Sequence, residues 1–169
     1  ETPPTHNNRS RGAGGVWGII QLMFSIIKKF LKGKETLHDA CDKGDIETVK
    51  QHLSAGADVN AIDDDWGMTP LILAADDAHI KVAELLIANG ADLNSKSRSV
   101  SMTSLHAAAC DNQKEITALL IVKGADINAK DSNGKTPLNY AEEEKNTDLA
   151  TLLRKHGGKT FEELKAAGK

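Results

Sequence analysis

Apolar residues between positions 34 and 158 occur in short runs at helical spacing, and these runs repeat along the chain. Within a run, apolar side chains recur at intervals of three and four residues, which places them on one face of a helix. The pattern therefore predicts a series of short amphipathic helices, each with one buried face. Two of these runs are Val82, Leu85 and Leu86, and Ile116, Leu119 and Leu120.

A second kind of run, rich in small residues, precedes each of these helices. It begins with leucine and contains alanine, so the helix that it predicts lets neighbouring helices approach closely. A unit of one small-residue helix and one leucine-rich helix cannot bury its apolar face alone, and such units have to stack. The small-residue runs begin at Leu37, Leu71, Leu105 and Leu138.

The boundaries between units repeat as well. The triplet Gly-Ala-Asp begins at Gly56, Gly90 and Gly124, in steps of 34 residues, and an Asn follows each Asp by two positions. Helices often end at a residue with a left-handed backbone conformation, and glycine adopts this conformation readily. Thr-Pro pairs at Thr69 and Thr136 predict helix starts, because threonine can cap a helix and proline at the first helical position loses no useful donor.

These residues resemble the ankyrin repeat. The family pattern combines a Thr-Pro-Leu-His helix start, an Ala-Ala pair and the sequence Gly-Ala-Asp-Val-Asn-Ala, which stands unchanged at 56–61. The resemblance implies an all-α solenoid of stacked helix-turn-helix units with projecting β-hairpin loops. It also implies a non-catalytic protein that binds another protein through the loop tips and the face of the first helices. The expected repeats are 34–63, 64–97, 98–131 and 132–158.

Several positions depart from the family pattern. Ile72 stands where histidine is usual, Ser101 stands where glycine is expected, and the glycine between the two helices of a unit is replaced by Ala78, Asn112 and Lys145. We therefore expect the second and third units to be less stable than consensus units. The fourth unit is expected to act as a cap, because its outer face is polar.

The chain ends are expected to differ from the repeats. Thr160 and Glu163 have the spacing of a capping box, which predicts a short capping helix within 159–169. This ending resembles those of some bacterial ankyrin proteins. Residues 1–15 are polar and rich in Pro, Asn, Ser and Gly, a composition typical of disorder.

Residues 16–33 predict an amphipathic helix with a narrow basic stripe. Three interpretations compete for this helix: it lies in a membrane interface, it is a signal or anchor segment, or it covers the open face of the first repeat as a cap. On the first interpretation, the repeats serve as a scaffold for a membrane-tethered protein. The candidate membrane contacts are Trp17, Phe24, Lys28, Lys29, Phe30 and Lys32.

The stretch DDDWGMTP falls in the loop between the first and second units. Its aspartates are expected to keep the loop tip in water, and Trp66 is a candidate anchor for a partner protein. The alternative is that Trp66 folds back onto the neighbouring loop and covers backbone. The second loop is basic and the third is mixed in charge.

Carboxylates are expected to form a row at the ends of the small-residue helices, from Asp42 to Glu144. Such a row favours a basic segment of a partner protein, although a solvated face chosen for solubility has the same composition. The full set of candidate partner-binding residues is Asp63, Asp64, Asp65, Trp66, Met68, Asp76, Asp77, Lys96, Arg98, Met102, Cys110, Asp111 and Lys135.

Composition and charge exclude several other classes. The net charge is −3, and residues 34–169 carry 16 basic and 23 acidic side chains, which argues against a nucleic-acid partner. The sequence shows no zinc-ligand spacing, no phosphate-binding loop and no nucleophile with a neighbouring base, so no metal, no cofactor and no enzymatic activity are expected. We expect a monomer in the cytoplasm or at the cytoplasmic face of a membrane.

The sequence also predicts where the cysteines and three of the histidines lie in the repeats. Cys41 aligns with the alanine pair and should be buried and inert, whereas Cys110 should lie on the exposed binding side. The resemblance gives His38 and His106 the family's structural hydrogen bond at the helix start. His79 stands at the histidine position between the two helices of its unit.

The membrane hypothesis makes a prediction of its own. A peptide of residues 14–33 should associate with anionic vesicles, because lysines attract anionic headgroups while the aromatic face enters the interface. Sedimentation with vesicles of phosphatidylserine and phosphatidylcholine would measure this association. A peptide that stays in solution with these vesicles would contradict the tether.

Overall fold

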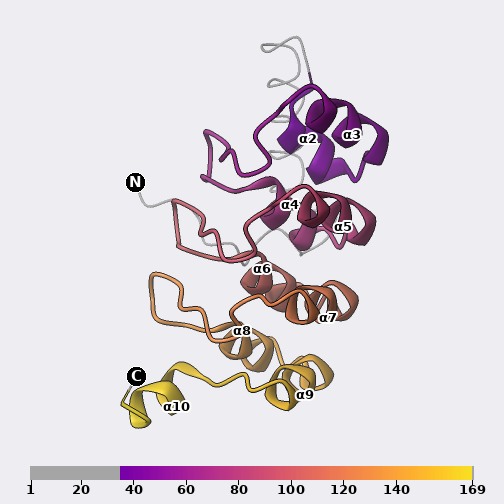
Figure 1. Cartoon of the computed structure of the whole chain (residues 1–169). Coiled ribbons are helices and arrows are strands. Elements are labelled where there is room, and N and C mark those ends of the chain that lie inside the picture. Colours follow the sequence, from indigo (N-terminus) through magenta and orange to yellow (C-terminus); the bar gives the residue numbers. More distant parts are fainter. Residues whose placement is uncertain (1–34, 169) are drawn as a thin grey trace, which may run out of the picture. The chain divides into compact units, whose positions relative to one another are not determined.

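The computed structural model describes residues 35–168 of the chain (Figure 1). The chain divides into two units, and the second, Leu37–Lys169, contains all the helices described below. The helices are α2 (Leu37–Lys43), α3 (Ile46–Ser54), α4 (Pro70–Asp76), α5 (Ile80–Ala88), α6 (Ser104–Cys110), α7 (Lys114–Val122), α8 (Pro137–Glu143), α9 (Thr147–Lys155) and α10 (Phe161–Ala166).

The helices of the second unit form two rows (Figure 1). In the inner row α2, α4, α6 and α8 each contact the next, and in the outer row α3, α5, α7 and α9 each pack against the inner helix that precedes them. The loops between repeats project on the side of the inner row, away from the outer row (Figure 1). The predicted all-α solenoid of stacked helix-turn-helix units is confirmed.

The inner row packs through small side chains. Ala74, Ala75, Ala107 and Ala108 are fully buried, and this lets the inner helices lie in direct contact. The outer helices bury larger side chains, and each buried leucine or isoleucine contributes about 1.5–3 kcal/mol relative to exposure. These buried outer side chains include Val82, Leu86, Ile116, Leu120, Leu149 and Leu153.

Side chains at fixed positions tie consecutive repeats together. The Asn60 Oδ1 accepts a hydrogen bond from the backbone N–H of Asp92 at 2.8 Å, and the Asn94 Oδ1 accepts one from Asp126 at 2.8 Å. Each of these bonds joins an Asn to the next repeat. This explains why an Asn recurs after every Gly-Ala-Asp triplet. At the end of the array, Asn128 Oδ1 accepts from Lys159 N at 2.8 Å.

The loops are closed by backbone hydrogen bonds. Asp63 N donates to Met68 O at 2.9 Å, and Ser97 N donates to Met102 O at 2.8 Å. Within residues 35–168 the loops contain turns but no strand, so they are hairpin-like without forming a β-ladder. Each loop also bonds its neighbour: Arg98 N donates to the Gly67 carbonyl at 3.1 Å, and a β-carbon at Gly67 would collide with Arg98.

The histidines have the structural roles that the family resemblance implied. His38 Nε2 donates to Ala61 O at 2.8 Å, and the buried His106 Nε2 donates to Lys135 O at 3.1 Å. His106 Nδ1 accepts from the Thr103 N–H, so the ring is neutral, and burial lowers its pKa. His79 Nε2 lies 3.0 Å from the carbonyl oxygen of Asp42 in the preceding repeat.

The predicted capping helix is α10. The Thr160 side chain accepts from Glu163 N, and Glu163 Oε2 accepts from Thr160 N at 2.7 Å, which completes the capping box. Leu164 is buried, and Phe161 N donates to Asn139 Oδ1 at 2.9 Å. The helix therefore packs against the fourth repeat at the end of the stack.

The predictions for residues 1–15 and 16–33, including the candidate membrane contacts, lie outside the described residues. Within the described part, no helix is long and apolar enough to cross a bilayer.

The departures from the glycine pattern have a backbone consequence. Ala78, Ser101, Asn112 and Lys145 all have positive φ, between 56° and 59°. At the position of Ala78, Asn112 and Lys145, between the two helices of a unit, the first repeat has Gly44, with φ of 70°. A side chain in this left-handed region costs about 1–2 kcal/mol, except that Asn tolerates it better.

Replacing Ala78 with glycine should therefore stabilise the protein. Ala78→Gly is expected to raise the free energy of unfolding by about 1 kcal/mol, since it relieves the left-handed strain but adds some unfolded-state entropy. Urea unfolding followed by circular dichroism would measure it. Asn112→Gly is the matched comparison and should gain less, and a lower urea midpoint for Ala78→Gly would contradict the strain argument.

Candidate functional site

The tip of the first loop presents two of its three aspartates to water. Asp64 and Asp65 are exposed, while Asp63 is only half-exposed. The Asp63 Oδ1 accepts from Trp66 N at 2.7 Å and Gly67 N at 2.9 Å, so its carboxylate shapes the turn. Of the predicted contacts at this tip, Asp63 is therefore committed to the loop itself, and its neighbours point outward.

Trp66 has features of both interpretations that the sequence left open. Its side chain is half-buried and packs against the main apolar core, and its carbonyl accepts from Ser99 N of the second loop at 3.3 Å. Trp66 therefore connects the first loop to the apolar core and to the second loop. The part of the indole that remains exposed lies next to the exposed Asp65 in the chain, where a partner can still reach it.

The two methionines of the predicted set are buried. Met68 is 4% exposed and Met102 is 1% exposed, and each one follows its loop directly before a helix cap. Because the helix start turns these side chains into the core, they do not reach a partner. The prediction of Met68 and Met102 as surface contacts was wrong.

The second loop contributes cations to the surface. Arg98 is exposed, and Lys96 is exposed but donates to the carbonyl of Lys130 in the third loop at 2.7 Å. Ser97 is 2% exposed and accepts from Met102 N at 3.1 Å. Arg98 therefore stands at the surface, while Lys96 connects two loops.

The carboxylates of the predicted row stand at the C-terminal ends of the inner helices. Asp77, Asp111 and Glu144 are the C-cap residues of α4, α6 and α8. Carboxylates at a helix C-terminus oppose the helix dipole, at about 0.3–1 kcal/mol each. No basic residue occupies the last turn of α4, α6 or α8 to offset this charge.

Two members of the row are less exposed than predicted. Asp76 is 4% exposed and Cys110 is 8% exposed, so the prediction that Cys110 lies on the exposed side was wrong. Both residues occupy the last position of an inner helix, α4 or α6, where contact with the adjacent helices covers them. Asp42 and Asp77 are exposed and Asp111 is half-buried.

The thiol of Cys110 shows that the carboxylates gather. Burial first, and then the negative charges of Asp111, Asp76, Glu144 and Glu143, together raise the pKa of Cys110 to about 12. These four side chains come from three neighbouring inner helices and their caps. Because α4, α6 and α8 stack in contact, their acidic ends lie near this thiol and form an acidic patch.

Lys135 joins the third loop to the acidic patch. Its ammonium lies 2.7 Å from Glu143 Oε2 and 5.5 Å from the centre of the Tyr140 ring. The Tyr140 hydroxyl donates to Asp131 Oδ2 at 2.7 Å, and burial followed by this bond raises the tyrosine pKa. Lys135 was predicted from the sequence as a contact residue, whereas Tyr140 and Asp131 were not. Nothing in the spacing of these residues indicates that the third loop and α8 are in contact.

The described residues offer little else for chemistry. Over residues 35–168 no group of three His, Cys, Asp or Glu side chains could hold a metal ion. Both cysteines are buried, and burial raises the pKa of Cys41 to about 12 as well, in agreement with the predicted inert thiol.

The family model "Ankyrin repeats (3 copies)" matches the chain at residues 18–97, 37–131 and 98–162. Because these matches span most of its length, the chain belongs to the ankyrin repeat family. The first match begins inside the predicted helix at 16–33. No curated protein matches the chain closely. Ankyrin repeats are in general non-catalytic modules for protein–protein interaction.

The pKa values of the two cysteines predict slow thiol chemistry. With pKa values near 12 instead of 9.0, about a thousandfold less thiolate is present at pH 8, and burial limits access further. Ellman's reagent at pH 8 should therefore react with the native chain far more slowly than with the chain unfolded in urea. Rapid native labelling that Cys110→Ser abolishes would show that this thiol is accessible.

Proposed function

We propose that this protein binds a basic segment of a partner protein on its loop and inner-helix side. The single observation that carries the proposal is the acidic patch at the ends of α4, α6 and α8. Such charge placement works against helix stability, so a use in recognition explains it better than a use in folding.

The remaining features of this side suit the same partner. Asp64 and Asp65 extend the negative charge to the first loop tip, and the exposed part of Trp66 offers an apolar anchor beside them. A half-buried tryptophan ringed by charge is typical of a binding hot spot. Arg98 at the next tip would pair with an acidic residue of the partner and fix its direction.

The structure narrows the set of residues in the proposal. Met68, Met102, Asp76 and Cys110 are buried and are left out. The proposed contacts are Asp64, Asp65, Trp66, Asp77, Arg98, Asp111 and Glu144, with Lys135 at the edge of the patch.

Capture from a lysate of the native host tests the proposal. The full chain is immobilised as wild type, Trp66→Ala and the double variant Asp77→Lys/Asp111→Lys, and retained proteins are identified by mass spectrometry. A specific partner should be lost by both variants. For that purified partner, we expect the affinity to fall about tenfold or more for each variant, since a hot-spot residue or a charge cluster is removed.

Salt and a matched variant make the test specific. The affinity of the wild type should fall as NaCl rises from 0.05 to 0.5 M, because exposed charges are screened. Glu84→Lys on α5 also reverses an exposed carboxylate, but on the outer row, and it should leave the partner bound. If all variants retain the same proteins, the inner side is not the binding site.

A further inference from the structure

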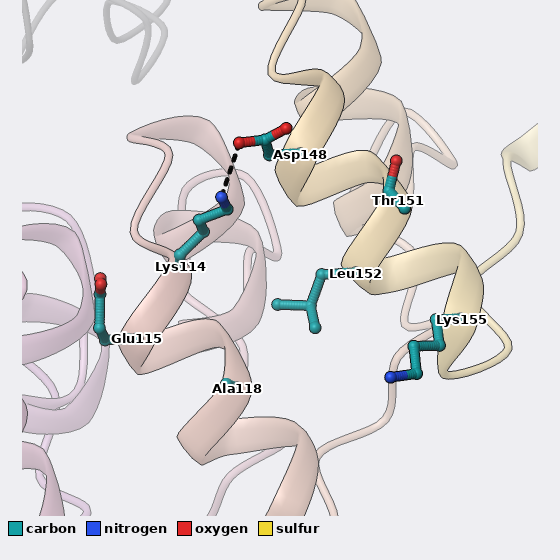
Figure 2. A pocket seen from close by; sticks show the side chains of 7 residues that line it. All are labelled: Lys114, Glu115, Ala118, Asp148, Thr151, Leu152 and Lys155. Carbon is teal, nitrogen blue, oxygen red and sulfur yellow. Dashed lines mark hydrogen bonds and ion pairs between the residues drawn. The ribbon is translucent and has the colours of Figure 1, made fainter.

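An open groove lies between α7 and α9 in the outer row (Figure 2). Its volume is about 450 Å³, and α7 and α9 supply all of its lining residues. Leu152 points from α9 toward α7, and Lys155 extends from the next turn to the same side (Figure 2). The groove belongs to the outer helices and is separate from the proposed loop and inner-helix site.

One of the positions on α7 that line the groove carries a small side chain. Ala118 lies on its lining, whereas the equivalent residue of α5, 34 positions earlier, is Glu84. In the outer row α3 contacts α5 and α5 contacts α7, but α7 and α9 approach each other less closely. The repeat pattern therefore differs at this position, and a small side chain faces the groove where α5 has a larger one.

Apolar atoms dominate the middle of the groove. Ala118 and Leu152 face it from opposite helices. One turn beyond Ala118 on the same face of α7 is Val122, whose side chain is 79% exposed. Val122 and Ile62 are the only large hydrophobic residues classed as exposed in the part of the chain that the structure describes. The apolar strip thus continues out of the groove along α7.

The lysines at the two ends of the groove differ in whether they form an ion pair. At one end, Lys114 is paired with Asp148 at 2.7 Å (Figure 2). At the other end, Lys155 has no ion pair with any described residue. A ligand for this groove should therefore combine an aliphatic side chain with a carboxylate on the Lys155 side.

We propose that the α7–α9 groove is a second docking site, which takes a short segment of a partner protein with an aliphatic residue next to an acidic one. The aliphatic side chain lies between Ala118 and Leu152 and extends toward Val122. The carboxylate pairs with Lys155. This proposal does not depend on the acidic patch, since the two surfaces share no residue and select segments of opposite charge.

Selection from a random 12-residue peptide library on phage tests the site with the full-length protein. Enriched peptides are synthesised, and their affinities are measured by fluorescence polarisation. Peptides with Leu, Ile or Val beside Asp or Glu should be enriched. Their binding should weaken at least tenfold with Ala118→Glu, which installs the residue that α5 carries at this position and fills the groove, and with Lys155→Glu.

Matched variants complete the design. Glu84→Ala, at the equivalent position of α5, and Asp77→Lys, in the acidic patch, should leave these affinities unchanged. Circular dichroism checks that each variant is folded, and Lys155→Glu keeps the test informative if Ala118→Glu is not. Peptides that bind all variants equally, or a selection that enriches none, would overturn the proposal. A dimer of the wild type that Ala118→Glu converts to a monomer would also overturn it, since the occupant would then be a second copy.

Discussion

The contact between inner helices is the constraint on which the rest of this protein depends. Ala74, Ala75, Ala107 and Ala108 are fully buried between α4, α6 and their neighbours, and no larger side chain would let these short helices touch. Helices of seven residues are too short to be stable alone, so their stability comes from the neighbouring repeats. Once the inner row is stacked, Asn60 and Asn94, in the loops that follow the outer helices, come within hydrogen-bond distance of the next repeat.

The same stacking generates the proposed recognition surface. Loops that follow each outer helix must return to the inner row, and this brings the three loops side by side, joined by hydrogen bonds such as that from Arg98 N to Gly67 O. It also aligns the C-terminal ends of α4, α6 and α8, so that carboxylates of three successive repeats, Asp76, Asp111 and Glu144 among them, become neighbours around Cys110. Function in such a protein resides in positions that the stack exposes but does not need for its own stability.

The outer row shows what a single departure from the repeat can do. At the position where α5 has Glu84, α7 has Ala118, and this small side chain lines the groove between α7 and α9. Departures at Ala78 and Lys145 have a different effect, because there the fold keeps its left-handed backbone and the side chain bears the strain. A departure creates strain where the fold fixes a left-handed backbone conformation at that residue. It creates space where only the size of the side chain changes.

The sequence by itself determined the architecture, because the 34-residue period, the Thr caps and the small-residue runs each correspond to one local structure. It also located the loop tips, the acidic helix ends and the structural histidines. Only the tertiary structure decided which of these side chains reach water. Met68, Met102, Asp76 and Cys110 carry the right chemistry at the right period, but contacts from adjacent elements bury them. The Lys135–Tyr140–Asp131 contacts and the α7–α9 groove were equally invisible in the sequence. The burial of a side chain and the gaps between helices depend on contacts between repeats. The period of the sequence does not specify these contacts.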